Sequence, residues 1–313
     1  SRAGWLCPLC VGTGQRVGLS AVEPRLEAPG LHGGLHQALP LAGHGLRAVF
    51  GDKNLVTTSS HHPMKVSWAE YKQIVANDLE LDGAVIYRGQ RRSNWGLVSS
   101  VHRTALVRSI ADLKGYADYM LPQVHDALEA WVGRSWNLKD ALGLAEFLAF
   151  VQHNGFPTPL LDWTQSPFIA AYFAFEGVNH FDPQTEDVAI FAFNQQAWRS
   201  AFVQVYDFAD FTPHVSVLRP RQVGNHKLAV QQGCFTVTNV LDVEDHIRLN
   251  ETPERRYLTK YELDVRERPR VIRELSLMGV SAIQLTPSVE AVCKKALEDL
   301  IGLVPMEKAQ GST

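Results

Sequence analysis

Residues 152–164, QHNGFPTPLLDWT, hold the densest run of polar and aromatic side chains in the sequence. The run follows residues 138–153, whose apolar side chains recur at helical spacing, and it precedes the apolar run 168–175. Gly155 is expected to end the first helix, because helices commonly close on a glycine in the left-handed conformation. We therefore expect a loop shaped by Gly and Pro and held between two buried helices. Loops held this firmly often carry functional residues.

Short apolar runs and helical patterns alternate around this loop. We expect strands at residues 83–89, 187–193, 257–263 and 281–285, weaker strands at 202–206 and 215–218, and one interrupted by Gly233 at 228–237. We expect further helices at residues 67–78, 101–136, 266–278 and 289–301. Strands outnumber crossover helices in the middle of the chain, which favours antiparallel pairing. The predicted fold is α+β, with a mostly antiparallel, split sheet flanked by helices.

Composition limits the classes of partner. The 30 basic and 33 acidic residues give a formal charge of -3, which provides no general electrostatic grip on nucleic acid or anionic membranes. No uninterrupted apolar run approaches the roughly eighteen residues of a membrane span. Four cysteines are too few for a disulfide framework, so we expect a cytoplasmic protein. Cys7 and Cys10 have the spacing of half a zinc ribbon without a second pair, so no metal is expected there.

The first part of the sequence differs from the rest. Residues 1–63 hold ten of the 23 glycines and five of the 12 histidines, with no sustained helical or alternating period. From Met64 the sequence becomes amphipathic with helical spacing, and Ser67 can cap the helix that this pattern predicts. We expect a disordered or artefactual leader over residues 1–63, one domain over 64–304, and a disordered tail over 305–313.

Three sequence motifs limit the protein families that this sequence can resemble. Patterns typical of dinucleotide folds, phosphate loops, serine hydrolases and zinc proteases do not occur. Instead, residues 87–90 read YRGQ, residues 152–167 read QHxGxPTxLLDWTxSP, and residues 231–236 read QxGxFT. Together these motifs resemble the FRG domain family, named for its (F/Y)RG motif, over roughly residues 66–300. Lys227 departs from the family pattern, which commonly has an arginine there, and a lysine lacks bidentate geometry.

The order of these motifs is similar to that of the site in ADP-ribosyltransferases, and this likeness implies NAD as substrate. Arg88 would hold the ribose or pyrophosphate of NAD, residues 162–164 would support the nicotinamide pocket, and Gln231 would lie on a later strand at the position of the catalytic carboxylate. Gln cannot supply the anion that an oxocarbenium ion needs, whereas Asp162 can. The expected catalytic set is Arg88, His153, Asp162 and Gln231. The expected binding set is Tyr87, Gln90, Trp95, Thr158, Trp163, Thr164 and Tyr172.

Other interpretations remain open on the sequence alone. His153 could bond a carbonyl at its helix end, Asp162 could cap the next helix, and Arg88 could form a buried ion pair with Asp162 or Glu146. Gln231 could simply satisfy backbone groups beside Gly233. A second class is a metal-dependent hydrolase or nuclease built from His102, His153, Asp162 and Glu146. A third is a non-catalytic module that binds a nucleotide or peptide. No motif in the sequence identifies a macromolecular target. A role in defence or as a toxin stays open.

Overall fold

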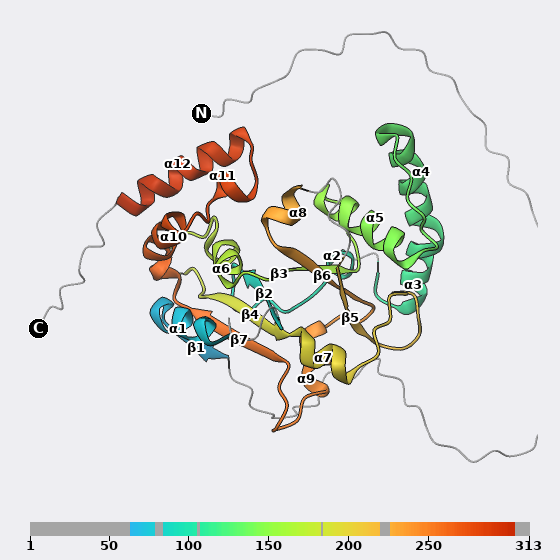
Figure 1. The fold of residues 1–313 in the computed structure, drawn as a ribbon, viewed down its shortest axis with the longest axis horizontal. Coiled ribbons are helices and arrows are strands. Elements are labelled where there is room, and N and C mark those ends of the chain that lie inside the picture. Colours follow the sequence, from blue (N-terminus) through green and yellow to red (C-terminus); the bar gives the residue numbers. More distant parts are fainter. Residues whose placement is uncertain (1–62, 79–83, 105–106, 183, 220–225, 304–313) are drawn as a thin grey trace, which may run out of the picture. The chain divides into compact units, whose positions relative to one another are not determined.

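A mixed sheet of seven strands runs through the part of the chain that the structure describes, which is residues 63–78, 84–104, 107–182, 184–219 and 226–303 of a computed structural model. The strand order is β1-β7-β4-β2-β3-β6-β5 (Figure 1). The strands are β1 (Met64–Lys65), β2 (Val85–Gln90), β3 (Leu160–Thr164), β4 (Val188–Asn194), β5 (Val215–Leu218), β6 (Gly233–Thr238) and β7 (Leu258–Leu263). The predicted leader, residues 1–63 with Cys7 and Cys10, lies outside the described residues except for Pro63. The predicted tail, residues 305–313, lies outside them as well, and so does Val304, the last residue of the predicted domain.

The sheet corrects the predicted pairing while the α+β class is confirmed. β1 pairs in parallel with β7, and the other neighbouring strands pair antiparallel, so the sheet is mixed rather than mostly antiparallel as predicted. β1 has only two residues, too few to show an alternating pattern in the sequence. Its place at the edge is fixed by tertiary pairing with β7, which no local pattern reports.

The centre of the sheet opens between β2 and β3. β2 pairs with β4 over six residues, and β3 pairs with β6 over five. β2 and β3 share a single register pair, Tyr87 with Thr164. Main-chain groups beyond that pair therefore need other partners, because buried backbone donors and acceptors are rarely left unpaired.

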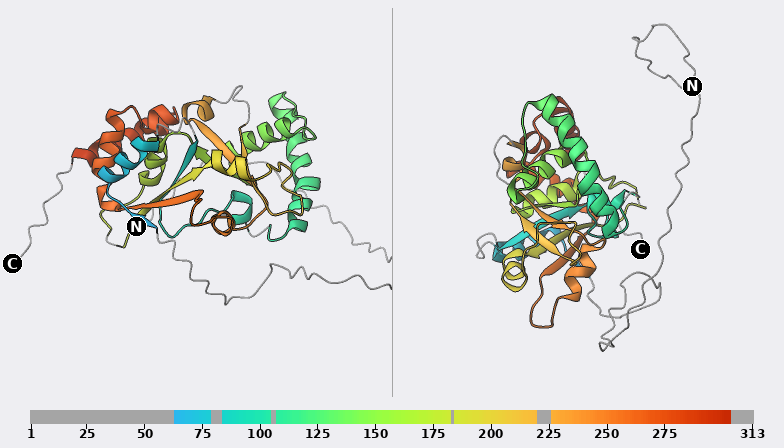
Figure 2. Two further views of the ribbon diagram at one scale, coloured as in Figure 1. Left: turned by 60° about the horizontal axis from the view of Figure 1, so that its bottom comes forward. Right: turned by 90° about the vertical axis from the view of Figure 1, so that its right-hand side faces the viewer.

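Helices gather at the two ends of the sheet. The first group is α1 (Trp68–Asp78), α6 (Pro167–Phe175), α10 (Arg268–Leu277), α11 (Ala282–Leu285) and α12 (Val289–Leu303). The second is α2 (Ser100–Arg103), α3 (Ile110–Gly115), α4 (Leu121–Val132) and α5 (Ala141–His153). The shorter α7 (Gln195–Ala201), α8 (His226–Val230) and α9 (Val243–Leu249) lie along the later strands. Figure 2 shows α12 and α4 at opposite ends of the described chain.

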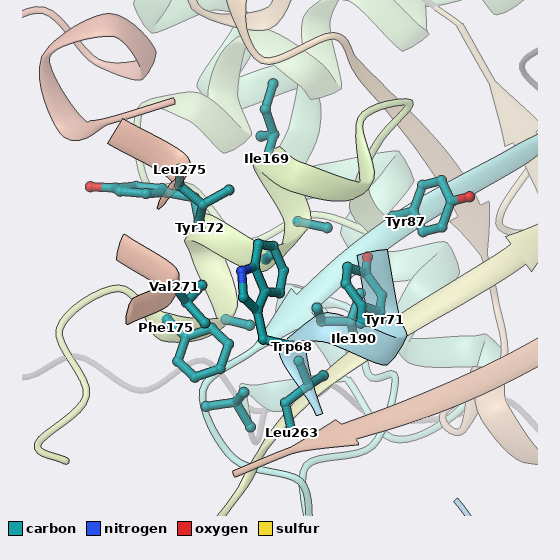
Figure 3. Packing of buried hydrophobic residues seen from close by; sticks show 14 of the residues in the cluster. Trp68, Tyr71, Tyr87, Ile169, Tyr172, Phe175, Ile190, Leu263, Val271 and Leu275 are labelled. Carbon is teal, nitrogen blue, oxygen red and sulfur yellow. The ribbon is translucent and has the colours of Figure 1, made fainter. Parts of the chain in front are cut away.

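Separate hydrophobic clusters lie beneath these groups. In the first, α6 packs between the sheet and α10, and Trp68 of α1 stacks on Tyr71 with ring centroids 5.7 Å apart (Figure 3). Phe175 and Leu275 join them with no exposed surface. The second cluster packs α3 to α5 against β3 and β6. β3 contributes Leu160 to the second cluster, and α6, which follows β3, belongs to the first. Packing in both clusters therefore fixes the position of the segment from β3 to α6.

Gly89 sets the contact between β2 and α6. A Cβ atom at this position would lie 2.0 Å from the carbonyl oxygen of Ala170 and 2.6 Å from the main-chain nitrogen of Ala174. Only a glycine allows the strand and the helix to approach this closely. The strand predicted to end at Gly89 continues one residue further, because β2 runs to Gln90.

Other local predictions were wrong where short segments depend on their neighbours. Residues 160–164 form strand β3 rather than loop, and residues 281–285 contain helix α11 rather than a strand. Residues 202–206 form no strand. Residues 228–237 divide into the end of α8 and most of β6. In each case a short run of mixed apolar and polar residues does not fix one structure by period alone, and packing decides.

Glu274 of α10 ties α1 to this end of the fold and makes stability depend on pH. Burial acts to raise the pKa of Glu274, but hydrogen bonds from Lys72, Trp68 and Arg270 outweigh it and hold the pKa at about 2 instead of 4.5. A depressed folded-state pKa stabilises the fold above the unfolded pKa and loses that effect as pH falls through the folded pKa. We expect Glu274→Gln to lower the free energy of unfolding by on the order of 2 kcal/mol at pH 7.

The difference between parent and Glu274→Gln should shrink as the pH falls from about 4.5 to about 2, the interval between the two pKa values. Urea unfolding at a series of pH values measures it. Glu290→Gln, on the first turn of α12, is a suitable control carboxylate. A constant difference across the acid range would mean that Glu274 stabilises by packing rather than by charge.

Candidate functional site

A cleft of about 950 Å³ lies where β2 and β3 separate. Its walls come from β2 and the segment after it, the end of α5, β3, α6, and residues around α8. The four side chains predicted as catalytic all line it: Arg88, His153, Asp162 and Gln231. The first three come from different elements, so their convergence is a property of the fold and not of local sequence.

Arg88 lies on the floor of this opening. Its Nη1 donates a hydrogen bond of 2.7 Å to the main-chain oxygen of Asp162 and lies 3.8 Å from Oδ2 of the same residue. The guanidinium therefore donates to a main-chain carbonyl of β3, that of Asp162, close to the point where β3 stops pairing with β2. Its side chain is 15% exposed, and its Nε is buried without a hydrogen-bond partner in the described part of the chain. Arg88 thus keeps unused donor capacity.

The charge of Arg88 is only partly balanced. Burial lowers the pKa of the Arg88 guanidinium from its ordinary value, and the Asp162 carboxylate acts in the opposite direction. Arginine remains protonated in proteins despite such shifts. The alternative of an ion pair with Asp162 is present in the structure at 3.8 Å, whereas Arg88 forms none with Glu146 among the described residues. The Asp162 side chain is 58% exposed, and Glu146 pairs instead with Arg134 at 2.8 Å.

Asp162 is the exposed residue in the middle of β3, between buried neighbours on both sides. Its Oδ1 accepts a hydrogen bond of 2.8 Å from Nε2 of Gln152. It does not cap the following helix, since Ser166 is the N-cap of α6 and accepts from the main-chain nitrogen of Ile169. Asp162 is therefore a solvent-reaching carboxylate held by a neutral donor.

His153 ends α5 and is half-buried. Its Nδ1 lies 2.8 Å from the carbonyl oxygen of Ala149. A carbonyl can only accept, so Nδ1 carries the hydrogen, and in the neutral ring Nε2 is then an acceptor. The bond to a helix-end carbonyl predicted as the alternative role is present. It is compatible with a chemical role, because it fixes the tautomer of a ring that also lines the cleft.

Gln231 corrects a positional prediction. It lies in the turn between α8 and β6, not on a strand. The Gln231 side chain makes a long hydrogen bond of 3.4 Å from Nε2 to the carbonyl oxygen of Leu285. The main-chain carbonyl of Gln231 accepts a hydrogen bond of 2.7 Å from Thr164 Oγ1. Gln232 next to it has a φ of 48°. The contacts of Gln231 thus join the wall of the cleft to α11 and β3, and its side chain bonds the carbonyl of Leu285 rather than a backbone group beside Gly233.

The predicted binding residues divide into two groups. Tyr87, Gln90, Trp95, Trp163 and Thr164 line the cleft. Thr158 and Tyr172 do not, because both side chains turn inward. Thr158 is fully buried, and the Tyr172 hydroxyl donates a 2.8 Å hydrogen bond to Glu298. Sequence position alone could not separate these two from their neighbours, since burial depends on which face packs.

Sequence reasoning missed most of the charges in the cleft. Among the described residues, its lining includes the cations Arg88, Arg91, Arg103 and Lys227 and the carboxylates Asp162 and Glu176. Glu176 is largely occupied, since it contacts Arg91 at 3.3 Å and also pairs with Lys294 of α12. Arg103 has no motif that marks it, and Lys227 is marked only as the position where the family pattern commonly has an arginine. Tertiary packing alone brings them to Arg88, so a cationic excess of this kind is not visible in the sequence.

Phe173 belongs to the apolar run 168–175, which was predicted to be a buried helix, but its side chain lines the cleft and is only partly buried on α6. Phe175, two residues later on the same helix, is fully buried. We expect Phe175→Ala to cost about 3–5 kcal/mol of unfolding free energy, and Phe173→Ala only about 1–2 kcal/mol, because less surface is removed from water. Urea unfolding of the two variants, each the other's control, measures this. Equal losses would place Phe173 in the core after all.

The alternative of a metal-dependent hydrolase finds no support in the geometry. It needs His102 and Glu146 beside His153 and Asp162. His102 Nδ1 lies 2.7 Å from Ser99 Oγ, Glu146 pairs with Arg134, and neither lines the cleft.

Fold and site together define an α+β domain with a cationic cleft at the opening of its sheet. The model of the FRG domain family matches residues 83–183, which span β2, α5, β3 and α6. The chain therefore carries an FRG domain, as its motifs predict, and the matched residues supply Arg88, His153 and Asp162. No curated protein and no solved structure matches the chain. Within the described residues, the helices are all too short or too polar to cross a membrane.

Proposed function

We propose that the cleft binds NAD and breaks the bond between nicotinamide and ribose, passing ADP-ribose to water or to an acceptor group. One observation carries the proposal: Arg88 is a mostly buried cation on the floor of the cleft with donor capacity that its protein neighbours do not use. A buried charge is costly unless an anion meets it. Asp162 Oδ2 lies 3.8 Å from Arg88 Nη1, which is beyond hydrogen-bond distance, so a ligand phosphate would offer the guanidinium a closer anion.

The rest of the lining fits a dinucleotide. Arg103 and Lys227 add positive charge without a carboxylate partner of their own among the described residues, as a pyrophosphate requires. Trp95 is 46% exposed and offers a ring on which a base can stack. The volume of about 950 Å³ lies at the upper end of the range for small-molecule sites.

The reaction assigns distinct roles to Asp162 and His153. The bond from ribose C1′ to the pyridinium nitrogen breaks, its electron pair stays with nicotinamide, and nicotinamide leaves neutral. Positive charge then develops on the ribose, and the Asp162 carboxylate stabilises it. Water or an acceptor hydroxyl forms the new bond to C1′, and its proton passes to Nε2 of His153 as general base. Gln231 takes no charge in this scheme.

Thermal stabilisation by NAD, followed by an assay of nicotinamide release, tests the proposal. NAD is expected to raise the melting temperature, because a ligand that binds only the folded state stabilises it. Asp162→Asn should keep this stabilisation and lower nicotinamide release by about 100-fold or more. Asp299→Asn is a matched control, since its side chain is equally exposed at 58% and lies outside the cleft.

Two results would overturn the assignment. No response to NAD in the parent protein would remove NAD as the ligand. Stabilisation without nicotinamide release would instead favour the non-catalytic nucleotide-binding module, for which the stacking surface of Trp95 and the cationic lining are sufficient.

A further inference from the structure

We propose that Gln152 is a positioning residue for the Asp162 carboxylate, and that the buried hydroxyl of Thr158 fixes the Gln152 amide in the orientation this requires. The inference rests on the proposed function for its consequence in catalysis. Its structural part, the orientation of two side chains, stands on hydrogen bonds alone.

The hydrogen bonds determine the direction of each group. Thr158 Oγ1 accepts from the main-chain nitrogen of Leu160 at 3.2 Å, so its single hydrogen is free to point elsewhere, and it contacts Gln152 Oε1. The amide oxygen of Gln152 therefore faces Thr158, and its Nε2 faces Asp162 Oδ1 at 2.8 Å. A glutamine amide is usually ambiguous between two orientations. Here the Asp162 carboxylate, which can only accept, removes that ambiguity, and the Thr158 hydroxyl then donates to the amide oxygen that faces it.

Thr158 is itself held in place by helix α2. Ser100 Oγ accepts from the Thr158 main-chain nitrogen at 2.8 Å and lies 3.1 Å from the Thr158 carbonyl. The same carbonyl accepts from the main-chain nitrogen of Val101 at 3.0 Å. Thr158 has no exposed surface. A continuous set of hydrogen bonds thus runs from α2 through Thr158 and Gln152 to a carboxylate at the mouth of the cleft.

A neutral donor suits this position. Asp162 is 58% exposed and would otherwise be free to turn toward solvent, because exposed side chains change rotamer readily. Gln152 fixes Oδ1 without adding a second positive charge to the one that Arg88 already places 3.8 Å from Oδ2, so it does not further offset the carboxylate charge that the developing ribose cation needs. A lysine or arginine here would hold Asp162 equally well but would neutralise it.

The test compares Thr158→Val, which keeps the shape and removes the hydroxyl, with Thr158→Ser, which keeps the hydroxyl. We expect Thr158→Val to lower kcat for nicotinamide release about 10-fold to 100-fold, the range typical when a supporting partner of a site residue is lost. KM should stay within about twofold, because the NAD contacts are unchanged. Thr158→Ser should restore kcat to within about threefold of the parent.

Thr238→Val separates positioning from general destabilisation. Thr238 is also fully buried and also donates its hydroxyl within the fold, to the His214 carbonyl at 2.9 Å, but unlike the Thr158 hydroxyl it contacts no residue that lines the cleft. This variant should lose stability and keep kcat. Unchanged kcat in Thr158→Val, or equal losses in the Val and Ser variants, would overturn the positioning role.

A crystal structure of Thr158→Val gives a readout that does not depend on NAD turnover. The Gln152 amide is expected to swing away from Asp162, and the Asp162 side chain to change rotamer. If the parent protein releases no nicotinamide, the proposed function fails while this structural result can still hold. An Asp162 side chain that stays in place would refute the inference whatever the activity.

Discussion

Arg88→Lys is expected to weaken NAD binding about 100-fold while the protein stays folded. A lysine keeps the positive charge but loses the planar fork that holds phosphate oxygens in pairs. The variant should lose about 3 kcal/mol of NAD binding free energy, because two charge-assisted hydrogen bonds are lost while the attraction of the positive charge is retained. This loss corresponds to about 100-fold in affinity. The melting temperature should fall by only a few degrees, because Arg88 makes one hydrogen bond within the described fold, to the Asp162 carbonyl.

Calorimetric titration with NAD and thermal melting of Arg88→Lys measure both quantities. Arg248→Lys is the control, because Arg248 pairs with Glu244 on α9 and lies outside the cleft. The opposite pattern, a large loss of stability with NAD affinity intact, would mean that Arg88 serves to join β2 to β3 and not to hold a ligand.

Gly89→Ala is expected to have the largest effect on stability of any single methyl group added to the described chain. The new Cβ would meet two backbone atoms of α6, at 2.0 and 2.6 Å, and backbone atoms cannot turn aside as a side chain does. Overpacking usually costs about 1–3 kcal/mol, and a clash with the backbone on this scale should reach about 3 kcal/mol or more. The melting temperature should then fall by at least about 6 °C in a domain of this size.

Gly115→Ala provides the matched control. Gly115 is also a glycine within regular structure, with a φ of -59°, and an added Cβ there meets no atom within 4 Å. Replacing it should be neutral or stabilising by about 0.5–1 kcal/mol, since alanine loses less conformational entropy in a helix. If both variants melt alike, β2 and α6 can separate by about an ångström at little cost, and the contact is looser than the structure indicates.

The sequence predicts those parts of the fold whose pattern is local. α5 and α6 follow from apolar periodicity with their end signals, and β2 and β4 from short apolar runs. β3 was missed because five residues between a proline and a helix cap show no period of their own. It becomes a strand only because β6 pairs with it along its length. Residues 281–285 were assigned the wrong structure for the same reason.

The site shows the same division. Arg88, His153 and Asp162 could be predicted because they stand within specific motifs. The inward turn of Thr158 and the arrival of Arg103 and Lys227 could not, because each depends on contacts between segments far apart in the sequence. Sequence patterns thus report which residues are special, whereas the electrostatic character of the cleft emerges only from packing.

The strand order limits how this domain can be cut. The family-matched residues 83–183 contribute β2 and β3, which are neighbours but share one register pair. Their long pairings are with β4 and β6, both of which come after residue 183. A fragment restricted to the matched residues would present two nearly separate strands with open edges, and isolated strands of this kind are prone to aggregate rather than fold. Any expression fragment, chimera or split reporter built on this domain must therefore retain at least the strands through β6, and the family match marks the motifs without marking a unit that can fold.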